Sequence, residues 1–505
     1  MSERNNGRIA FLNSPYILKE DFHQHMPPLS LLYLATYMKS NGFDVRIYNL
    51  DRFVRDKGFR YLGYNLNSLF NNLSLFNPQM IGITCQYSAR WPFVQRLIEI
   101  IKRWFKDIPV VIGGIHPTCF PEYCLCSSKA DYIILGEGEF SCLELFKHVL
   151  SRTTPSGLDG VAFRDNSKII CNPKKSFITD LDTLPFPDYS LIDINRYKQL
   201  CRKDYIAQLK GMYFPVLTSR SCPNQCRYCN LYLVHGRKWR ARSPDNVVKE
   251  LSYLVETYKV RQFAFVDDNF SFSRERTIAI LKEIVNGKIG PIKFIPLNGL
   301  SVKTLDDEVI WYLKKAGALE VSLAIESGSE YIRNTVYNKK VSTKKIIEVV
   351  RACKKYNLIC KAFFMVGAPE ETDDTIKESI DLMREIRIPA SFSITTPFKG
   401  TKLYDYYMKK KLISEDELKR GYFLDLRLPI GNTKSYTQII QWRRKLMIYN
   451  IWYSLPELLK HSKLLTFHNF NRLLATVLFP KKLTMDIINY AMDKYMPLFR
   501  YRKNV

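Results

Sequence analysis

The chain has 505 residues, of which 46% are hydrophobic, and it carries a net charge of +27. This length predicts about two to four domains, and the hydrophobic share is ordinary for globular proteins with sizeable cores. No apolar run approaches the roughly 18 residues of a membrane span, and the polar N-terminus lacks the apolar stretch of a secretory signal, so we expect a cytoplasmic protein. The basic charge raises the question of a polyanionic partner. No helix-turn-helix, zinc-finger or RNA-recognition signature accompanies it, and we do not expect nucleic-acid binding.

The first part of the chain alternates strands and helices. Predicted strands cover residues 8–13, 43–50, 80–84, 109–112 and 132–135, and predicted helices cover 29–41, 93–105 and 141–150. Near-continuous apolar strands separated by helices are typical of a buried parallel sheet of the doubly wound, Rossmann-like type. Ligands of such sheets bind beyond the carboxyl ends of the strands. The candidate binding residues that fall there are Gly113, Gly114, His116, Gly136 and Glu137.

Residues 153–205 read as a connector. The segments 157–164 and 168–171 predict a small hairpin around Asp165 and Asn166. Pro185 and Pro187 then favour an extended linker.

A second series of strands and helices occupies residues 206–430. Its predicted apolar strands are 215–218, 263–266, 293–297, 321–325, 361–366 and 392–395. Each strand ends in a polar or glycine-containing segment, and parallel β/α barrels place their active sites on that carboxyl face. Six such units are too few for the full eight-stranded barrel, so we predict a partial (β/α)6 barrel of the TIM type.

The cysteines Cys222, Cys226 and Cys229 follow the first of these strands. Three thiolates at this spacing can hold three corners of a cubane iron–sulfur cluster, which leaves the fourth iron without a protein ligand. Pro223 disfavours helical geometry for Cys222, so the motif should lie on a loop. A zinc site completed by His235 is the alternative. The strands and helices downstream favour the cluster, because a small zinc module does not need them.

We expect no disulfide bonds among the other cysteines, because disulfides are rare in proteins that stay inside the cell. Cys119, Cys124 and Cys126 lie close together in sequence, but without paired CxxC or histidine-rich spacing they favour buried thiols over a second metal site. The remaining cysteines, predicted to be mostly core residues, are Cys85, Cys142, Cys171, Cys201, Cys353 and Cys360.

The CxxxCxxC motif and the strand series that follows it resemble the radical S-adenosylmethionine (SAM) superfamily from about Tyr213 to Arg427. The resemblance implies a [4Fe-4S] cluster that binds SAM at its open iron, receives an electron from a flavodoxin or ferredoxin, and yields a 5′-deoxyadenosyl radical. By the same resemblance, the residues near SAM are Tyr228, Asp267, Asp268, Glu326, Ser327 and Gly367. Core packing by Tyr228 and helix capping by the two aspartates are the alternatives.

The N-terminal residues 1–152 look like the cobalamin-binding-type domain that precedes many radical SAM cores. The resemblance rests on the helix after Pro27 and Pro28 and on the two glycine segments named above. Asp21 and His23 begin an Asp-x-His-x-x-Gly pattern whose glycine is missing. The resemblance therefore implies cobalamin without a histidine on cobalt, with His23, His25 and His116 as loop or pocket residues.

Residues 431–505 form a basic, aromatic extension predicted to be helical. From residue 441 onward it holds twelve Lys and Arg against three Asp and Glu. The favoured interpretation is a helical cap over the open side of the barrel. Basic amphipathic helices with aromatic residues can also dock at the inner face of a membrane, and the two roles are compatible.

The resemblance favours C-methylation of an unactivated carbon of a natural-product, lipid or tetrapyrrole-type small molecule. Cyclisation, oxidation or carbon–carbon coupling by the same architecture, as in anaerobic porphyrin cyclases, is the alternative within the family. A metal-stabilised nucleic-acid-binding or membrane-binding protein without turnover is the alternative from another class.

Overall fold

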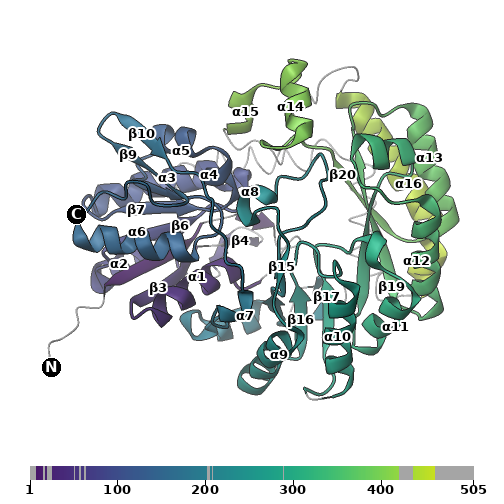
Figure 1. Ribbon diagram of the computed structural model, residues 1–505, viewed down its shortest axis with the longest axis horizontal. Coiled ribbons are helices and arrows are strands. Elements are labelled where there is room, and N and C mark those ends of the chain that lie inside the picture. Colours follow the sequence, from purple (N-terminus) through teal and green to yellow (C-terminus); the bar gives the residue numbers. More distant parts are fainter. Residues whose placement is uncertain are drawn as a thin grey trace.

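The structure is a computed structural model that describes residues 7–14, 17–19, 26–50, 52–55, 58–61, 64–201, 205–206, 209–287, 289–419 and 436–460. Two α/β domains lie side by side, the first drawn in purple and blue and the second in teal and green (Figure 1). Within the described residues, no helix is long and apolar enough to cross a lipid bilayer.

The N-terminal domain is built on a seven-stranded sheet in the order β10-β9-β8-β7-β6-β1-β3. Its strands are β1 (Arg8–Asn13), β3 (Asp44–Asn49), β6 (Met80–Thr84), β7 (Val110–Gly113), β8 (Tyr132–Ile134), β9 (Val161–Asp165) and β10 (Lys168–Cys171). The strands from β3 to β8 pair in parallel, which confirms the predicted doubly wound sheet. The strand order reverses between β1 and β6, and ligand crevices open at such reversals.

The hairpin of β9 and β10 confirms the predicted turn around Asp165 and Asn166. It also pairs antiparallel with β8, so the N-terminal sheet continues into the predicted connector. A small sheet of β2 (Ile17–Lys19), β4 (Arg52–Arg55) and β5 (Gly58–Tyr61) was not predicted. The rest of the connector contains η3 (Leu181–Thr183), η4 (Tyr189–Leu191), α7 (Ile194–Cys201), β11 (Tyr205–Ile206) and β12 (Leu209–Lys210).

Helices cover both faces of the N-terminal sheet. They are α1 (Leu29–Ser40), α2 (Leu66–Phe76), η2 (Ser88–Arg90), α3 (Trp91–Trp104), α4 (Ile115–Cys119), α5 (Pro121–Ser127) and α6 (Glu139–Ser151). Gly42 follows α1 with a φ of +88°, the left-handed conformation that ends helices. The predicted end of this helix is therefore confirmed.

The second domain contains the six predicted parallel strands. They are β13 (Phe214–Val216), β16 (Gln262–Phe265), β17 (Lys293–Pro296), β18 (Glu320–Glu326), β19 (Ile359–Val366) and β20 (Ala390–Ile394). They pair as two three-stranded sheets. The Leu319 amide donates to the Phe294 carbonyl at 2.9 Å and brings β17 and β18 together. The result is the predicted partial barrel.

Helices and short ribbons surround the barrel. They are β14 (Ser219–Arg220), α8 (Tyr232–His235), β15 (Arg240–Ala241), α9 (Pro244–Tyr258), α10 (Arg274–Val285), η5 (Val302–Thr304), α11 (Asp307–Lys315), the π-helical turn η6 (Tyr331–Val336), α12 (Thr343–Lys355), α13 (Asp373–Ile386), α14 (Lys402–Lys409) and α15 (Glu415–Lys419). A Ser, Thr or Asp side chain caps the N-terminus of each long helix from α9 to α13.

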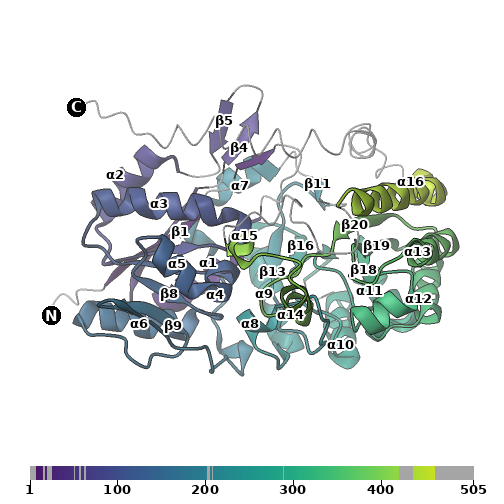
Figure 2. The same ribbon diagram turned by 90° about the horizontal axis from the view of Figure 1, so that it is seen from above.

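The helix α16 (Tyr436–Lys460) covers the last strand of the barrel, as Figure 2 shows. The Ala390 amide donates to Asn450 Oδ1 at 3.0 Å, and Arg443 Nε donates to the Phe392 carbonyl at 2.9 Å. Edge strands with free backbone groups invite pairing with other chains, and this helix prevents it. The helical character of the C-terminal region is thus confirmed for residues 436–460, and residues 431–435 and 461–505 lie outside the described ones.

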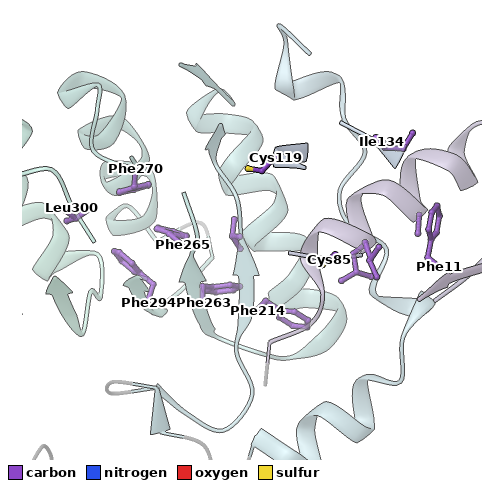
Figure 3. Close-up of a cluster of buried hydrophobic side chains, with 14 of the residues drawn as sticks. Phe11, Cys85, Cys119, Ile134, Phe214, Phe263, Phe265, Phe270, Phe294 and Leu300 are labelled. Carbon is purple, nitrogen blue, oxygen red and sulfur yellow. The ribbon is translucent and has the colours of Figure 1, made fainter. Parts of the chain in front are cut away.

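One hydrophobic cluster runs through both domains. Figure 3 draws Phe11 and Cys85 of the N-terminal sheet in the same view as Phe214 and Phe263 of the barrel. The predicted core cysteines that are buried are Cys85, Cys142, Cys353 and Cys360. Cys171 is the exception and is exposed because it ends the edge strand β10. Cys119 and Cys124 are buried thiols as expected, but Cys126 is exposed. The side chain of Cys201 lies outside the described residues.

Candidate active site

The three motif cysteines lie on the loop between β14 and α8, here called the cysteine loop (residues 221–231). Cys222 and Cys226 are half-buried and Cys229 is exposed. Ser221 has a φ of +74° and turns the chain into the loop, and its amide donates to Asp268 Oδ2 at 3.1 Å. The carboxyl end of β16 therefore fixes where the first cysteine lies.

Amide groups surround the first sulfur. Asn224 Nδ2 and Asn269 Nδ2 each donate to Cys222 Sγ at 3.5 Å. Hydrogen bonds to sulfur tune iron–sulfur clusters, so the donor set and its surroundings fit such a group. Burial raises the pKa of the Cys229 thiol to about 11. Because cysteines ligate metals as thiolates, assembly of a cluster here must release protons.

The zinc alternative finds little support in the geometry. His235 Nδ1 lies 3.2 Å from Glu137 Oε1, so its side chain already has a carboxylate neighbour on the other domain. Among the described residues, no three His, Cys, Asp or Glu side chains converge as ligands of a single metal ion. A cubane differs in that each cysteine binds a separate iron.

Three hydrogen-bonded side chains join the cysteine loop to the end of β18: the buried Glu326 and Lys339 and the half-buried Tyr228. Glu326 Oε1 accepts hydrogen bonds from Lys339 Nζ at 2.7 Å and from the Tyr228 hydroxyl at 2.9 Å. Lys339 Nζ also lies 3.2 Å from that hydroxyl. Glu326 has a φ of +70° and sits at a register shift between β18 and β19. Strained conformations of this kind persist where the surroundings hold a side chain in a functional position. Tyr228 thus does more than pack in the core.

Lys339 is a site residue that the sequence did not reveal. Burial lowers its pKa, but the charges of Glu326 and Cys226 outweigh that effect and raise the pKa above its usual value. An ammonium group therefore stays beside the sulfur ligands, where it can balance negative charge. The sequence signal is weak, because Lys339 lies in no motif and is one of many lysines.

The loop after β18 is held by a second buried cation. Arg333 is fully buried and donates to the carbonyl oxygens of Ser327 at 2.7 Å and Gly328 at 3.3 Å. Ser327 Oγ accepts from the Ser329 amide at 3.2 Å. Ser329 Oγ is buried and has no hydrogen-bond partner. Sequence reasoning identified Ser327 but missed Arg333, which orders the loop.

The two aspartates after β16 fix the base of the cysteine loop. Asp267 Oδ1 accepts from the amide and hydroxyl of Thr218 at 3.1 and 2.7 Å and from Ser219 Oγ at 2.6 Å. Burial raises the pKa of Asp267, and its Oδ2 is buried without a partner. Neither aspartate caps the next helix, since Ser273 caps α10. The capping alternative is therefore wrong.

Gly367 follows β19 on the opposite side of the barrel mouth. Its φ is +96°, and its amide donates to Glu371 Oε2 at 2.5 Å. A Cβ at this position would lie 3.2 Å from Ile439 Cδ1 of α16. The helical cap thus reaches the mouth of the barrel beside this glycine.

The carboxyl edge of the N-terminal sheet is shaped by glycines. Gly114 has a φ of +110°, and a Cβ there would lie 2.6 Å from the Cys85 carbonyl oxygen. At Gly113 the nearest atom would be 3.8 Å away, so the backbone is open to close approach. An open glycine backbone at the carboxyl edge of such a sheet fits a large flat ligand like cobalamin.

His116 lies inside this domain. It is fully buried, its Nδ1 lies 3.0 Å from Ser88 Oγ, and its ring packs between Trp91 and Phe120. Burial lowers its pKa to about 3, so the imidazole is neutral. Its Nε2 has no hydrogen-bond partner. His23 and His25 lie outside the described residues.

Gly136 and Glu137 face the barrel. A Cβ on Gly136 would lie 3.0 Å from the Val234 carbonyl oxygen of α8, which lies between the two domains in Figures 1 and 2. Glu137 accepts hydrogen bonds from Arg240 in the barrel domain. Nearby, Asn230 Nδ2 of the cysteine loop donates to Cys119 Sγ of α4 at 3.5 Å. The carboxyl edge of the N-terminal sheet therefore meets the cysteine loop.

Two family models match the chain. Residues 17–146 match the B12 binding domain, and residues 216–383 match the Radical SAM superfamily. The chain is a radical SAM enzyme with a B12-binding domain. The alternative of a protein without turnover is thereby set aside.

Relatives of this radical SAM enzyme align along most of its length. An uncharacterized methyltransferase of Pyrococcus horikoshii is 29% identical over 86% of this chain and 89% of its own. The cytidylyl-2-hydroxyethylphosphonate methyltransferase of Streptomyces wedmorensis is 23% identical over 81% and 83%. The anaerobic magnesium-protoporphyrin IX monomethyl ester cyclase of Rubrivivax gelatinosus is 25% identical over 79% and 72%.

Solved structures share the architecture. The methyltransferase TsrM of Kitasatospora setae, solved with cobalamin and a [4Fe-4S] cluster, gives a TM-score of 0.64 at 19% identity over 80% of this chain and 78% of its own. OxsB, solved with aqua-cobalamin and SAM, gives 0.69 at 16% identity over 97% and 76%. At these identities the likeness establishes the fold: a B12-binding domain followed by a radical SAM domain.

Proposed function

We propose that this enzyme transfers a methyl group to an unactivated carbon of a small molecule. The observation that carries the proposal is the contact between the cysteine loop and the glycine-shaped edge of the B12-binding sheet, where Asn230 meets Cys119. When bound, the cluster and SAM would supply a carbon-centred radical and cobalamin would supply the methyl group. A substrate held between the two domains would be within reach of both.

The barrel residues have distinct roles in this proposal. Cys222, Cys226 and Cys229 hold the cluster. Glu326 and Lys339 offer a carboxylate and an ammonium group to the ribose hydroxyls and the methionine carboxylate of SAM, and their mutual bond of 2.7 Å keeps both in position. Further contacts to SAM are assigned to Tyr228, Ser327 and the backbone of Gly367, with Asp267 and Asp268 supporting the loop.

The N-terminal domain binds cobalamin through its backbone in this proposal. Gly113 leaves the backbone of the carboxyl edge open there, and Gly114 lets the chain pack closely against the Cys85 carbonyl. His116 is buried with its Nδ1 3.0 Å from Ser88 Oγ, and in this proposal it would not ligate the cobalt. Glu137 and Gly136 shape the neighbouring wall.

The names of the relatives support a methyl acceptor of the natural-product, lipid or tetrapyrrole type. One relative is named for a nucleotide-linked phosphonate and another for a magnesium porphyrin. The cyclase among them supports cyclisation of a tetrapyrrole as a second candidate reaction. A flavodoxin or ferredoxin in the cytoplasm would supply the electron.

Peripheral membrane contact is supported by the outer face of α16. Lys445, Ile448, Tyr449 and Trp452 recur there at helical spacing, and Trp452 is 74% exposed. Apolar and basic residues on one helix face favour anionic lipid surfaces. Sedimentation with phosphatidylglycerol vesicles should fall in a Trp452→Ala variant, and equal sedimentation would remove the idea.

Anaerobic reconstitution with iron, sulfide and cobalamin tests the main proposal. The purified chain should show cluster and cobalamin absorbance, and with dithionite it should convert SAM to 5′-deoxyadenosine. Cys226→Ala should lose both the cluster and the cleavage. Cys171→Ala is the matched control, since that thiol is exposed on β10 and should leave both intact. SAM cleavage that survives Cys226→Ala would overturn the assignment, and absence of bound cobalamin would favour a cobalamin-free reaction.

A further inference from the structure

Two carboxylates of the B12-binding domain are buried against two arginines of the barrel domain. Glu137 accepts two parallel hydrogen bonds from Arg240, at 2.6 and 3.0 Å. Glu139 accepts one from Arg220 at 2.6 Å, and Arg220 also lies 3.5 Å from Glu137. Each of the four residues is at most 5% exposed. Two positive and two negative charges thus balance within one buried group, here called the interdomain clamp.

The two arginines occupy matching places around the cysteine loop. Arg220 ends β14, two residues before Cys222, and Arg240 begins β15 after the loop has returned. The strands pair antiparallel with Arg220 opposite Arg240. The segment 221–239, which contains the cysteine loop and α8, is therefore bound at both ends to residues 137–139 of the other domain.

Further contacts make the clamp rigid. Arg240 also donates to the carbonyl oxygens of Ile178 and His235, each at 2.6 Å. Burial would raise the pKa of Glu137, but hydrogen bonds with His235 and Arg240 and the charges of the two arginines hold it well below its usual range. The carboxylate is therefore ionised at neutral pH.

Stability alone is a weak reason for such a group. Desolvating an ion pair offsets most of its attraction, so apolar residues of similar volume often serve stability as well. What a bidentate pair of arginine and carboxylate adds is a defined distance and orientation. Such a pair is useful between two domains that must keep a fixed distance from each other.

We propose that Glu137 and Glu139 are positioning residues that set the distance between the cysteine loop and the B12-binding sheet. Glu137 acts through Arg240, and Glu139 acts through Arg220. The inference rests on the proposed function, because a radical and a methyl group must reach one substrate from opposite domains. Loss of the clamp should therefore separate SAM cleavage from product formation.

Hydrogen exchange of the reconstituted full-length protein tests the clamp without turnover. Glu139→Gln leaves Arg220 buried beside a neutral amide and should speed exchange in residues 219–241 about a hundredfold. Exchange in β6 and β7 should not change, and iron content should match the unmodified protein. Lys39→Gln is the matched control, because it removes an exposed contact of 2.7 Å to Asp188 in the connector. Glu139→Asp, which keeps the charge, should recover part of the protection.

Unchanged exchange in residues 219–241 would overturn the inference. If exchange in β6 and β7 became faster by the same factor as in residues 219–241, the inference would also be overturned. That result would mean that the clamp stabilises the whole domain and does not position the cysteine loop. Should Glu139→Gln fail to fold, the neutral double variant Glu139→Gln/Arg220→Gln provides the same comparison. In either variant, 5′-deoxyadenosine should still form and its ratio to methylated product should rise. Absence of SAM cleavage by the unmodified protein would sink the proposed function but not the exchange result.

Discussion

The carboxyl edges of the two parallel sheets face the same region but are built differently. The barrel edge carries charged groups and sulfur, such as Lys339, Glu326 and the cysteine loop. The edge of the N-terminal sheet carries glycines and the buried, neutral His116. A charged ligand such as SAM needs ionic partners, whereas a large flat ring needs uncovered backbone. The carboxyl edge of a parallel sheet can thus bind a ligand through charged side chains, as in the barrel, or through exposed backbone, as in the N-terminal sheet.

The largest effect is expected on the barrel edge, from Lys339→Met. This change leaves Glu326 buried without its cation and should lower the free energy of unfolding by about 3–5 kcal/mol. Urea denaturation of the apoprotein measures it. The neighbouring Lys340→Met is the control, because that side chain is exposed and should change stability by less than about 0.5 kcal/mol. Adding Glu326→Gln to Lys339→Met should recover most of the loss. Similar losses for the two lysine variants would contradict the buried pair.

Two glycines of the N-terminal edge give a sharper comparison. Gly114→Ala forces a Cβ to within 2.6 Å of the Cys85 carbonyl oxygen at a φ of +110°, and should destabilise the domain by about 3 kcal/mol. Gly113→Ala meets only ordinary contacts and should leave stability nearly unchanged. If the backbone at Gly113 faces cobalamin, the same variant should retain less cobalamin after desalting, as read from its visible spectrum. If the variant retained all of its cobalamin, the cofactor would not lie against Gly113.

His116 predicts a pH dependence of the N-terminal domain. Its pKa is about 3 when folded, against an ordinary value near 6.5, so below that value the unfolded chain binds more protons than the folded one. Stability is therefore complete above about pH 6.5 and falls by about 1.4 kcal/mol per pH unit as the pH drops toward 3. Urea denaturation between pH 7 and pH 5 measures the slope. In His116→Phe the slope should flatten by that amount, and an unchanged slope would locate the titration elsewhere.

Much of the framework could be predicted because it depends on local patterns. Apolar runs that end in glycine or polar residues gave the six barrel strands, and Pro223 with the cysteine spacing gave the cysteine loop. The capping role suggested for Asp267 failed because its partners, Thr218 and Ser219, lie 49 and 48 residues earlier in the chain. The residues around Asp267 look the same in sequence whether the aspartate caps the next helix or binds a distant segment.

The residues that were missed share one property. Lys339, Arg333 and Arg240 act through buried contacts that only the fold creates, and each looks like an ordinary surface cation in sequence. The partner of Arg240 lies in the other domain, whereas Arg333 folds back onto the carbonyl oxygens of its own loop. Glu137 was predicted as a cofactor residue because it follows a strand, yet its charged partners Arg220 and Arg240 are on the other domain. A lone charged residue becomes informative only when the fold supplies its partner.

The smallest effect is expected where α16 meets the barrel, outside both carboxyl edges. Trp442 Nε1 donates to Asp373 Oδ1 at 2.6 Å, which ties the helical cap to the first turn of α13. Trp442→Phe keeps most of the buried ring and removes this bond, so it should lower the free energy of unfolding by about 1–2 kcal/mol. Thermal unfolding followed by circular dichroism measures the loss, with the exposed Trp452→Phe as control. Because Gly367 packs against Ile439 of the same helix, a loosened cap should also weaken SAM binding. Unaltered SAM affinity would show that the cap supports the barrel without shaping its mouth.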